Sequence, residues 1–254
     1  MANEESVVKR VMKYFRKTVP GSTLEDIGEE ITDEQRAIWE RSQEFEFNFW
    51  VNQWTTTHAQ RDGQQLSIEE IISARQKAGI WLLQNFHIPI SDDLTSEIFA
   101  GTVLEVGCGP IGFFEQFPAV KVLGIDPLMG QFAAHLYYSV LGARNNYLYD
   151  ETHIKELRDN EFDWIVCSNV LDHTENYKFM LREMIRVADK RGVILLVTDC
   201  RNKGELGHAQ AFSAGQILDY VVRHGFFVEF CKIVYPLHAG EDAVSLFAKI
   251  RQRN

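Results

Sequence analysis

The sequence has no long hydrophobic run and a deficit of basic residues. Its 254 residues include 26 Lys and Arg against 36 Asp and Glu, a formal net charge of −10. Aliphatic runs such as 193–197 are far too short to cross a bilayer, so we expect no stable membrane insertion. A strongly acidic chain also repels phosphate backbones, and we therefore expect no nucleic-acid partner.

Cysteine is scarce, and its spacing excludes the common metal motifs. The four cysteines are far apart and form no C-x-x-C pair, which fits neither a zinc site nor an iron–sulfur site. The first residues contain no apolar stretch typical of a secretory signal. We therefore expect reduced thiols in a cytoplasmic protein. No three metal-ligating side chains converge in the sequence, and we predict no metal.

The front and the back of the chain have different patterns. Residues 1–99 indicate helices, whereas 100–254 alternate short aliphatic runs with helical periods. We expect strands near 102–107, 120–126, 145–149, 163–168 and 192–199, and helices near 111–117, 129–142, 175–189 and 213–224. This alternation predicts an α/β fold, a parallel sheet with helices on both faces. The last two runs, 226–235 and 243–250, are joined by a loop alone and predict an antiparallel hairpin at the sheet edge.

The front part contains two signatures of helix starts. Thr32 is followed by Gln35, and Ser67 is followed by Glu70, each spaced as a capping box. The segment 45–54 of the first of these helices carries apolar side chains on both faces, which predicts that both faces are covered. We interpret its Phe45 and Phe49 as core residues.

The most informative stretch is a glycine-rich loop that follows a predicted strand. Residues 107–112 match G-x-G-x-x-G in the context that a nucleoside-binding loop requires. Gly107 and Gly109 would let the backbone approach a ligand closely. Nineteen residues after Gly107, Asp126 ends the next strand, where a carboxylate can accept hydrogen bonds from both ribose hydroxyls.

Dinucleotides and S-adenosylmethionine both suit such a loop, and Glu105 discriminates between them. An acidic side chain at the loop would repel a pyrophosphate and attract an ammonium group. Pro110 removes a backbone donor that a phosphate could use. A cationic nucleoside without phosphate therefore fits better, and S-adenosylmethionine is the common one.

These residues resemble the class I S-adenosylmethionine-dependent methyltransferases over roughly residues 100–250. The matching stretches, in the family's order, are 104–109, 124–127, 162–173, 181–188, 192–196, 212–213 and 224–226. The resemblance implies a three-layer, Rossmann-like sheet of seven strands whose last strand is antiparallel. It also implies a methyltransferase domain at 100–254, with 1–99 as an N-terminal helical extension or lid.

The resemblance also implies which residues hold the cofactor. Glu105 would lie near the methionyl amine, Asp126 would hold the ribose, and Glu151 would lie near the adenine amino group. The full implied set is Glu105, Gly107, Cys108, Gly109, Asp126, Pro127, Leu128, Glu151, Ser168, Asn169 and Val170.

Residues for the methyl acceptor follow from chemistry. A hydroxyl acceptor needs a base for its proton, and histidine is best suited near neutral pH. His173 and His208 follow predicted strands at the end of the sheet where ligands bind, and both are candidate bases. Tyr14, Trp50 and Trp54 could form an aromatic wall over the acceptor.

The resulting hypothesis is an S-adenosylmethionine-dependent methyltransferase. Its acceptor would be a small molecule or glycan precursor, methylated on oxygen, beneath a lid that excludes water. A homodimer is compatible with the sequence. Two alternatives stay open: a non-catalytic methyltransferase-like subunit that supports a partner, and a dinucleotide-dependent oxidoreductase.

Overall fold

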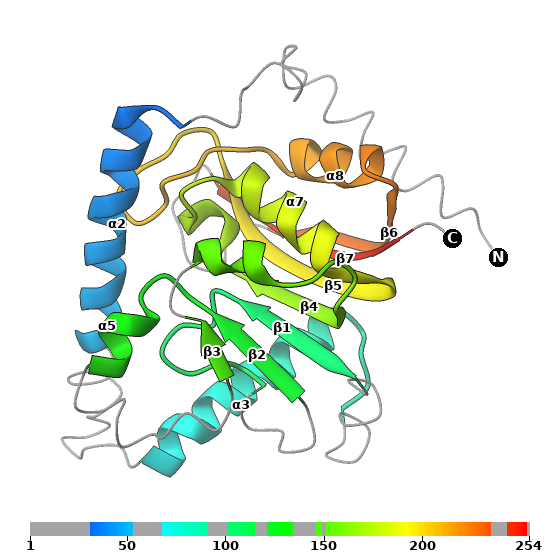
Figure 1. Ribbon diagram of the computed structural model, residues 1–254, viewed down its shortest axis with the longest axis horizontal. Coiled ribbons are helices and arrows are strands. Elements are labelled where there is room, and N and C mark those ends of the chain that lie inside the picture. The colour runs from blue at the N-terminus through cyan, green and yellow to red at the C-terminus, as the bar shows by residue number, and fades with distance from the viewer. Residues whose placement is uncertain are drawn as a thin grey trace.

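The strands form one seven-stranded sheet with the order β3-β2-β1-β4-β5-β7-β6 (Figure 1). The computed structural model describes residues 31–52, 68–90, 101–114, 121–134, 146–148, 151–234 and 243–252. The strands are β1 (Thr102–Val106), β2 (Lys121–Ile125), β3 (Asn146–Leu148), β4 (Phe162–Ser168), β5 (Ala188–Arg201), β6 (Phe226–Val234) and β7 (Ala243–Gln252). Strands β1 to β5 pair in parallel, which confirms the predicted parallel sheet.

Strand β7 runs against the rest of the sheet. It pairs antiparallel with β5, from Val193 opposite Arg251 to Arg201 opposite Ala243. On its other side it pairs antiparallel with β6. The predicted hairpin is therefore confirmed, and β7 is inserted between β5 and β6, so that β6 forms the edge. The seven strands with an antiparallel last strand match the fold that the sequence resemblance implied.

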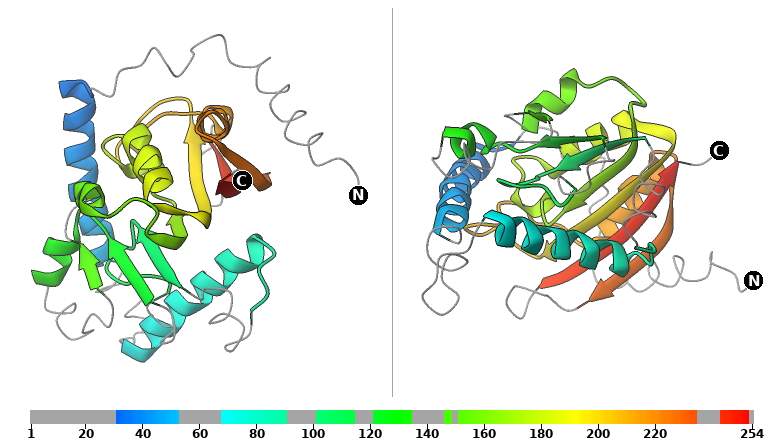
Figure 2. Two further views of the ribbon diagram at one scale, coloured as in Figure 1. Left: turned by 45° about the vertical axis from the view of Figure 1, so that its right-hand side comes forward. Right: turned by 90° about the horizontal axis from the view of Figure 1, so that it is seen from below.

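Helices cover both faces of this sheet (Figure 2). The described helices are α2 (Asp33–Asn52), α3 (Ile68–Asn85), α5 (Met129–Ala134), α7 (Tyr177–Val187) and α8 (Ala214–Arg223), with short 3-10 helices η3 (Glu151–Glu156) and η4 (Leu171–His173). Helix α3 lies on one face, and α7 and α8 lie on the other. Helix α2 stands beside the end of the sheet at which the loops after β1, β2 and β4 gather (Figure 1).

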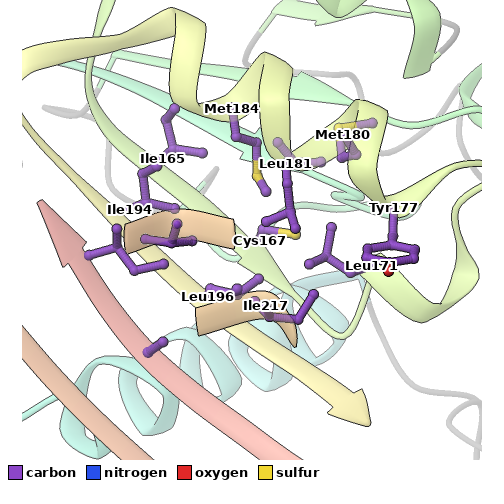
Figure 3. Close-up of a cluster of buried hydrophobic side chains, with 14 of the residues drawn as sticks. Ile165, Cys167, Leu171, Tyr177, Met180, Leu181, Met184, Ile194, Leu196 and Ile217 are labelled. Carbon is purple, nitrogen blue, oxygen red and sulfur yellow. The ribbon is translucent and has the colours of Figure 1, made fainter. Parts of the chain in front are cut away.

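The core explains why the central strands are almost uniformly apolar. Along β4, Ile165 and Cys167 point to the cluster under α7 and α8, whereas Val166 points to the cluster under α3. Figure 3 shows the first cluster, where Met184 of α7 and Ile217 of α8 meet the sheet. A strand covered on both faces needs apolar residues at successive positions, which is the pattern in the sequence.

Local capping fixes where several helices begin. The predicted capping box at α2 is confirmed: the Thr32 amide donates to Gln35 Oε1 at 2.9 Å, and the Gln35 amide donates to Thr32 Oγ1 at 3.1 Å. Ser213 and Gln216 form the same reciprocal pair at α8. At α7 the side chain of Asn176 accepts from two backbone amides of the first turn. Ser67, the expected start of α3, lies outside the described residues.

Two expectations of the sequence are wrong. A helix was predicted near 111–117, but 111–114 form bends, and the amides of Phe113 and Phe114 bond to the Glu105 carboxylate instead of to helical carbonyls. Phe45 and Phe49 were interpreted as core, but they are 48% and 42% exposed. Within the described residues, the face of helix α2 that carries Phe45 and Phe49 is therefore only partly covered, with the Phe45 ring against Gly207.

The sequence predicts no stable membrane insertion, and a membrane-spanning helix would have to be both long and apolar. Among the described helices, none combines the length and the apolar character that crossing a membrane demands.

The core predicts which truncations destabilise the fold. Ile165→Ala removes a fully buried side chain of β4 and is expected to lower the free energy of unfolding by about 2–5 kcal/mol, because a cavity remains. Leu206→Ala is the matched control, since Leu206 is 57% exposed and its loss is expected to change that free energy by less than about 0.5 kcal/mol. Urea unfolding followed by circular dichroism measures both, and equal effects would contradict this account of the core.

Candidate active site

The glycine loop leaves β1 and turns tightly against the end of β2. Gly107 and Gly109 have φ values of +65° and +63°, which residues with a Cβ rarely adopt. A Cβ on Gly107 would collide with the side chain of Val170, which follows β4. The Gly107 amide donates to the Ile125 carbonyl at 2.8 Å. The first two glycines are therefore required by backbone conformation and close packing.

Asp126 holds this loop in place from the end of β2. Its Oδ2 accepts from the Gly109 amide at 2.8 Å, and its Oδ1 accepts from the Leu128 amide at 2.9 Å. Burial raises the pKa of Asp126 to about 6, although these two amide hydrogen bonds act in the opposite direction. Each carboxylate oxygen has a second lone pair, so the group can accept two further hydrogen bonds.

Glu105 lies beneath the loop. Its Oε1 accepts from the Phe113 amide at 2.7 Å, and its carboxylate is almost fully buried. A Cβ on Gly112 would lie 2.5 Å from Oε2 of Glu105, so the third glycine makes room for this side chain. The structure thus gives Glu105 a role that the sequence did not predict, in which it binds the backbone amides that follow the loop.

Arg75 connects helix α3 to the same loop. Its Nε donates to the Ile111 carbonyl at 2.8 Å, and its Nη2 donates to the Cys108 carbonyl at 3.4 Å. Its guanidinium carbon lies 4.2 Å from the centre of the Phe113 ring and 5.3 Å from that of Trp50. No local motif around Arg75 identifies it, because the two carbonyls that it binds lie more than 30 positions away.

Trp50 of α2 lies over the glycine loop. A Cβ placed on Gly109 would be 3.5 Å from Cζ2 of the Trp50 ring. One turn earlier, Phe47 stacks on Phe132 of α5 with ring centres 5.7 Å apart. Trp50 is therefore adjacent to the loop expected to hold the cofactor. Tyr14 and Trp54, the other members of the predicted aromatic wall, lie outside the described residues.

The remaining predicted cofactor residues fall into four places. Cys108 is buried in the loop, and burial raises the pKa of its thiol. Pro127 and Leu128 follow β2. Ser168 ends β4, and Asn169 and Val170 follow it, with Asn169 at a φ of +59°. Glu151 begins η3, and the placement of its side chain lies outside what the structure describes.

The two candidate bases lie side by side. The rings of His173 and His208 have centres 4.6 Å apart, although 35 positions separate them in the chain. Between them lies the fully buried Asp172, whose Oδ2 is 2.7 Å from Nδ1 of His208 and 3.7 Å from Nε2 of His173. Thr198 donates to Oδ1 at 3.2 Å. Burial opposes ionisation of Asp172, but the two histidines outweigh it and lower its pKa.

Arg201 decides the hydrogen position on His208. Its Nη2, which can only donate, lies 3.1 Å from Nε2 of His208. Nε2 is therefore the acceptor, and Nδ1 carries the hydrogen that faces Asp172. Asp172, His173 and His208 have the spacing of a metal-ligand set, which the sequence did not suggest. If a metal ion bound Nδ1 of His208, Nε2 would carry the hydrogen and would point it at the Arg201 donor. The arrangement therefore favours a hydrogen bond between Asp172 and His208 over a metal site.

Helix α2 contributes polar groups that the sequence analysis missed. Glu46 accepts from Trp50 Nε1 at 3.0 Å, and its other oxygen lies 3.7 Å from Nδ1 of His173. Gln43, one turn earlier, donates to the His173 carbonyl at 3.5 Å. Within the part of the chain that the structure describes, Gln43 Oε1 and Trp39 Nε1 are buried without a hydrogen-bond partner.

Comparison with known proteins identifies the domain. Residues 104–196 match the model of a methyltransferase domain family. No protein of curated function matches the chain.

Solved structures share the fold at low sequence identity. Phosphoethanolamine N-methyltransferase 2 of Haemonchus contortus, in complex with phosphomonomethylethanolamine and S-adenosylhomocysteine, is 14% identical, with 89% of this chain and 62% of that chain covered and a TM-score of 0.57. A Galdieria sulphuraria protein assigned as a sarcosine dimethylglycine methyltransferase is 13% identical, with coverages of 83% and 97% and a TM-score of 0.54. Magnesium protoporphyrin IX methyltransferase of Synechocystis PCC 6803, with bound S-adenosylmethionine, is 15% identical, with coverages of 87% and 99% and a TM-score of 0.50.

At these identities the structural likeness shows the fold, and the family model identifies the domain that has it. The matched segment runs from β1 to β5, and the sheet order and the antiparallel β7 complete the fold. Residues 104–196 therefore form a methyltransferase domain, and the sheet has the fold of the solved methyltransferase structures.

Proposed function

We propose that this protein binds S-adenosylmethionine and transfers its methyl group to an oxygen of a small molecule or glycan precursor. The observation that carries the proposal is the glycine loop bonded to Asp126, which places a buried carboxylate beside a backbone surface that no Cβ obstructs. The cofactor supplies an electrophilic methyl group on a sulfonium, with a thioether as the leaving group. The protein then has to hold, align and dehydrate the reactants.

The loop fits a cofactor that lacks phosphates. In dinucleotide-binding folds, backbone amides after the glycine loop face the pyrophosphate. Here the amides of Phe113 and Phe114 bond to Glu105, and Pro110 has no amide hydrogen. The donors that a pyrophosphate would need are therefore used, which supports S-adenosylmethionine over a dinucleotide.

The acceptor would bind between helix α2 and the loops after β4 and β5. His173 and His208 lie there, and the buried Gln43 Oε1 and Trp39 Nε1 face no partner within the described residues. A buried polar atom without a partner is costly, so such a pair indicates a ligand with both a donor and an acceptor. Helix α2 would act as the lid of the N-terminal extension, residues 1–99, over the domain at 100–254. Cytoplasmic location and homodimer formation stay predictions.

Calorimetry tests the cofactor. We expect S-adenosylmethionine and S-adenosylhomocysteine to bind and NAD not to bind. Binding of NAD alone would support an oxidoreductase, and binding of none of the three would support a non-catalytic subunit.

The raised pKa of Asp126 predicts how cofactor binding depends on pH. Protonation removes the negative charge of Asp126 and turns one of its acceptor sites into a donor, which weakens its hydrogen bonds to two hydroxyls. Asp126 becomes protonated as the pH falls through about 6. S-adenosylhomocysteine affinity is therefore expected to be constant above pH 7 and to fall below pH 6. Asp126→Asn is expected to weaken binding at pH 7.5 by about 10–100-fold, because hydrogen bonds to a charged acceptor are lost.

The control for this prediction is Asp219→Asn, a carboxylate on α8 that pairs with Arg223. It should bind like the wild type at every pH. A wild-type affinity that stays constant from pH 7.5 to 5 would contradict the role of Asp126.

Replacing Gln43 is expected to weaken acceptor binding without lowering the stability of the protein. Gln43→Met keeps the side-chain size and removes a buried acceptor without a partner, at the loss of one long, 3.5 Å hydrogen bond to the His173 carbonyl. The melting temperature is therefore expected to stay unchanged or to rise. Once an acceptor is found, its KM should rise about 5–50-fold, with S-adenosylhomocysteine affinity unchanged. Asn48→Ala, on the exposed face of α2, is the control, and a lower melting temperature for Gln43→Met alone would show that the amide is structural.

A further inference from the structure

Helix α2 brings a carboxylate from the N-terminal extension to one of the two candidate bases. Oε2 of Glu46 lies 3.7 Å from Nδ1 of His173, and the two side chains are 27% and 16% exposed. Charges that are only partly hydrated interact more strongly than surface charges do. This contact therefore has more effect on His173 than an exposed ion pair would have.

Glu46 is itself fixed by the residue that covers the glycine loop. Its Oε1 accepts from Trp50 Nε1 at 3.0 Å, and the Trp50 ring lies against Gly109. Residues 46 and 50 are one helical turn apart and face the same side. One helix surface thus contacts both the expected cofactor loop and His173.

The other nitrogen of His173 has a weak partner. Nε2 is 3.4 Å from Nδ2 of Asn169, an amide donor on an exposed residue. It is also 3.7 Å from Oδ2 of Asp172, a carboxylate that already bonds to His208 and Thr198. Nε2 is therefore the acceptor, and Nδ1 carries the hydrogen that faces Glu46. By contrast, Nε2 of His208 accepts from the cation of Arg201 at 3.1 Å. Protonation of Nε2 in His208 would place a positive charge against the Arg201 guanidinium. Protonation of Nε2 in His173 would instead replace a long contact to the neutral amide of Asn169.

We propose that Glu46 is a positioning residue that holds His173 in the tautomer able to act as the base. The inference rests on the proposed function and selects between the two histidines. The acceptor's hydroxyl proton passes to Nε2 of His173, and the oxygen keeps that electron pair for its new bond to the methyl carbon. The carbon–sulfur bond breaks with its electrons on sulfur, and the imidazolium is balanced by the carboxylate at Nδ1.

The titratable groups that face His173 come from three parts of the chain. Glu46 belongs to α2, Asp172 to η4, and His208 to the loop between β5 and α8. Asp172 is already bonded by His208 and Thr198. Glu46 is thus the carboxylate whose contact with His173 depends on the position of α2.

Nitrogen-15 NMR of the histidine rings tests this assignment in the full-length protein saturated with S-adenosylhomocysteine, at a pH where the rings are neutral. His173→Gln assigns the signals. We expect His173 to be the Nδ1–H tautomer in the wild type, and Glu46→Gln to move it to a mixture with at least about one third Nε2–H, because a neutral amide can donate as well as accept. His208, held by Asp172 and Arg201, should keep its tautomer in both proteins.

Glu44→Gln is the matched control, because Glu44 is an exposed carboxylate on the same helix. Its His173 signals should equal those of the wild type. An Nε2–H tautomer in wild-type His173 would overturn the proposal without any variant, and so would an unchanged ring in Glu46→Gln. Failure of wild-type protein to bind S-adenosylhomocysteine would instead overturn the proposed function, and calorimetry on the same samples separates the two results.

Discussion

The hydrogen bonds from the Gly109 and Leu128 amides to Asp126 determine the shape of the site. They join the loop after β1 to the turn after β2, at 2.8 and 2.9 Å. Burying a carboxylate is unfavourable, and the two amides compensate only in part, because the pKa of Asp126 is still raised to about 6. A ligand that donates further hydrogen bonds to this group would stabilise the folded protein as well as bind to it.

The N-terminal helices complete the site that the sheet begins. Arg75 of α3 binds two carbonyls of the glycine loop, and its guanidinium lies near the rings of Phe113 and Trp50. Helix α2 continues across the sheet end, where Ser42 accepts from the Gly207 amide at 3.0 Å. The segment without a family match in the sequence therefore contacts the loops after β1, β4 and β5, which is where an acceptor-binding element has to lie.

The sequence predicted the features that depend on neighbours along the chain. The parallel strands, the glycine loop and the Thr32 capping box all follow from local spacing. The helix near 111 was wrong because Glu105, from the preceding strand, takes the amides of Phe113 and Phe114. The pairing of His173 with Glu46 joins positions 127 residues apart, and no periodicity or motif encodes such a contact.

A crystal structure with bound S-adenosylhomocysteine tests the central claim most directly. We expect both ribose hydroxyls within hydrogen-bond distance of Asp126 and the amino-acid part between the glycine loop and Trp50. A ribose bound away from Asp126, or a loop that releases the Gly109 amide from this carboxylate, would contradict the account.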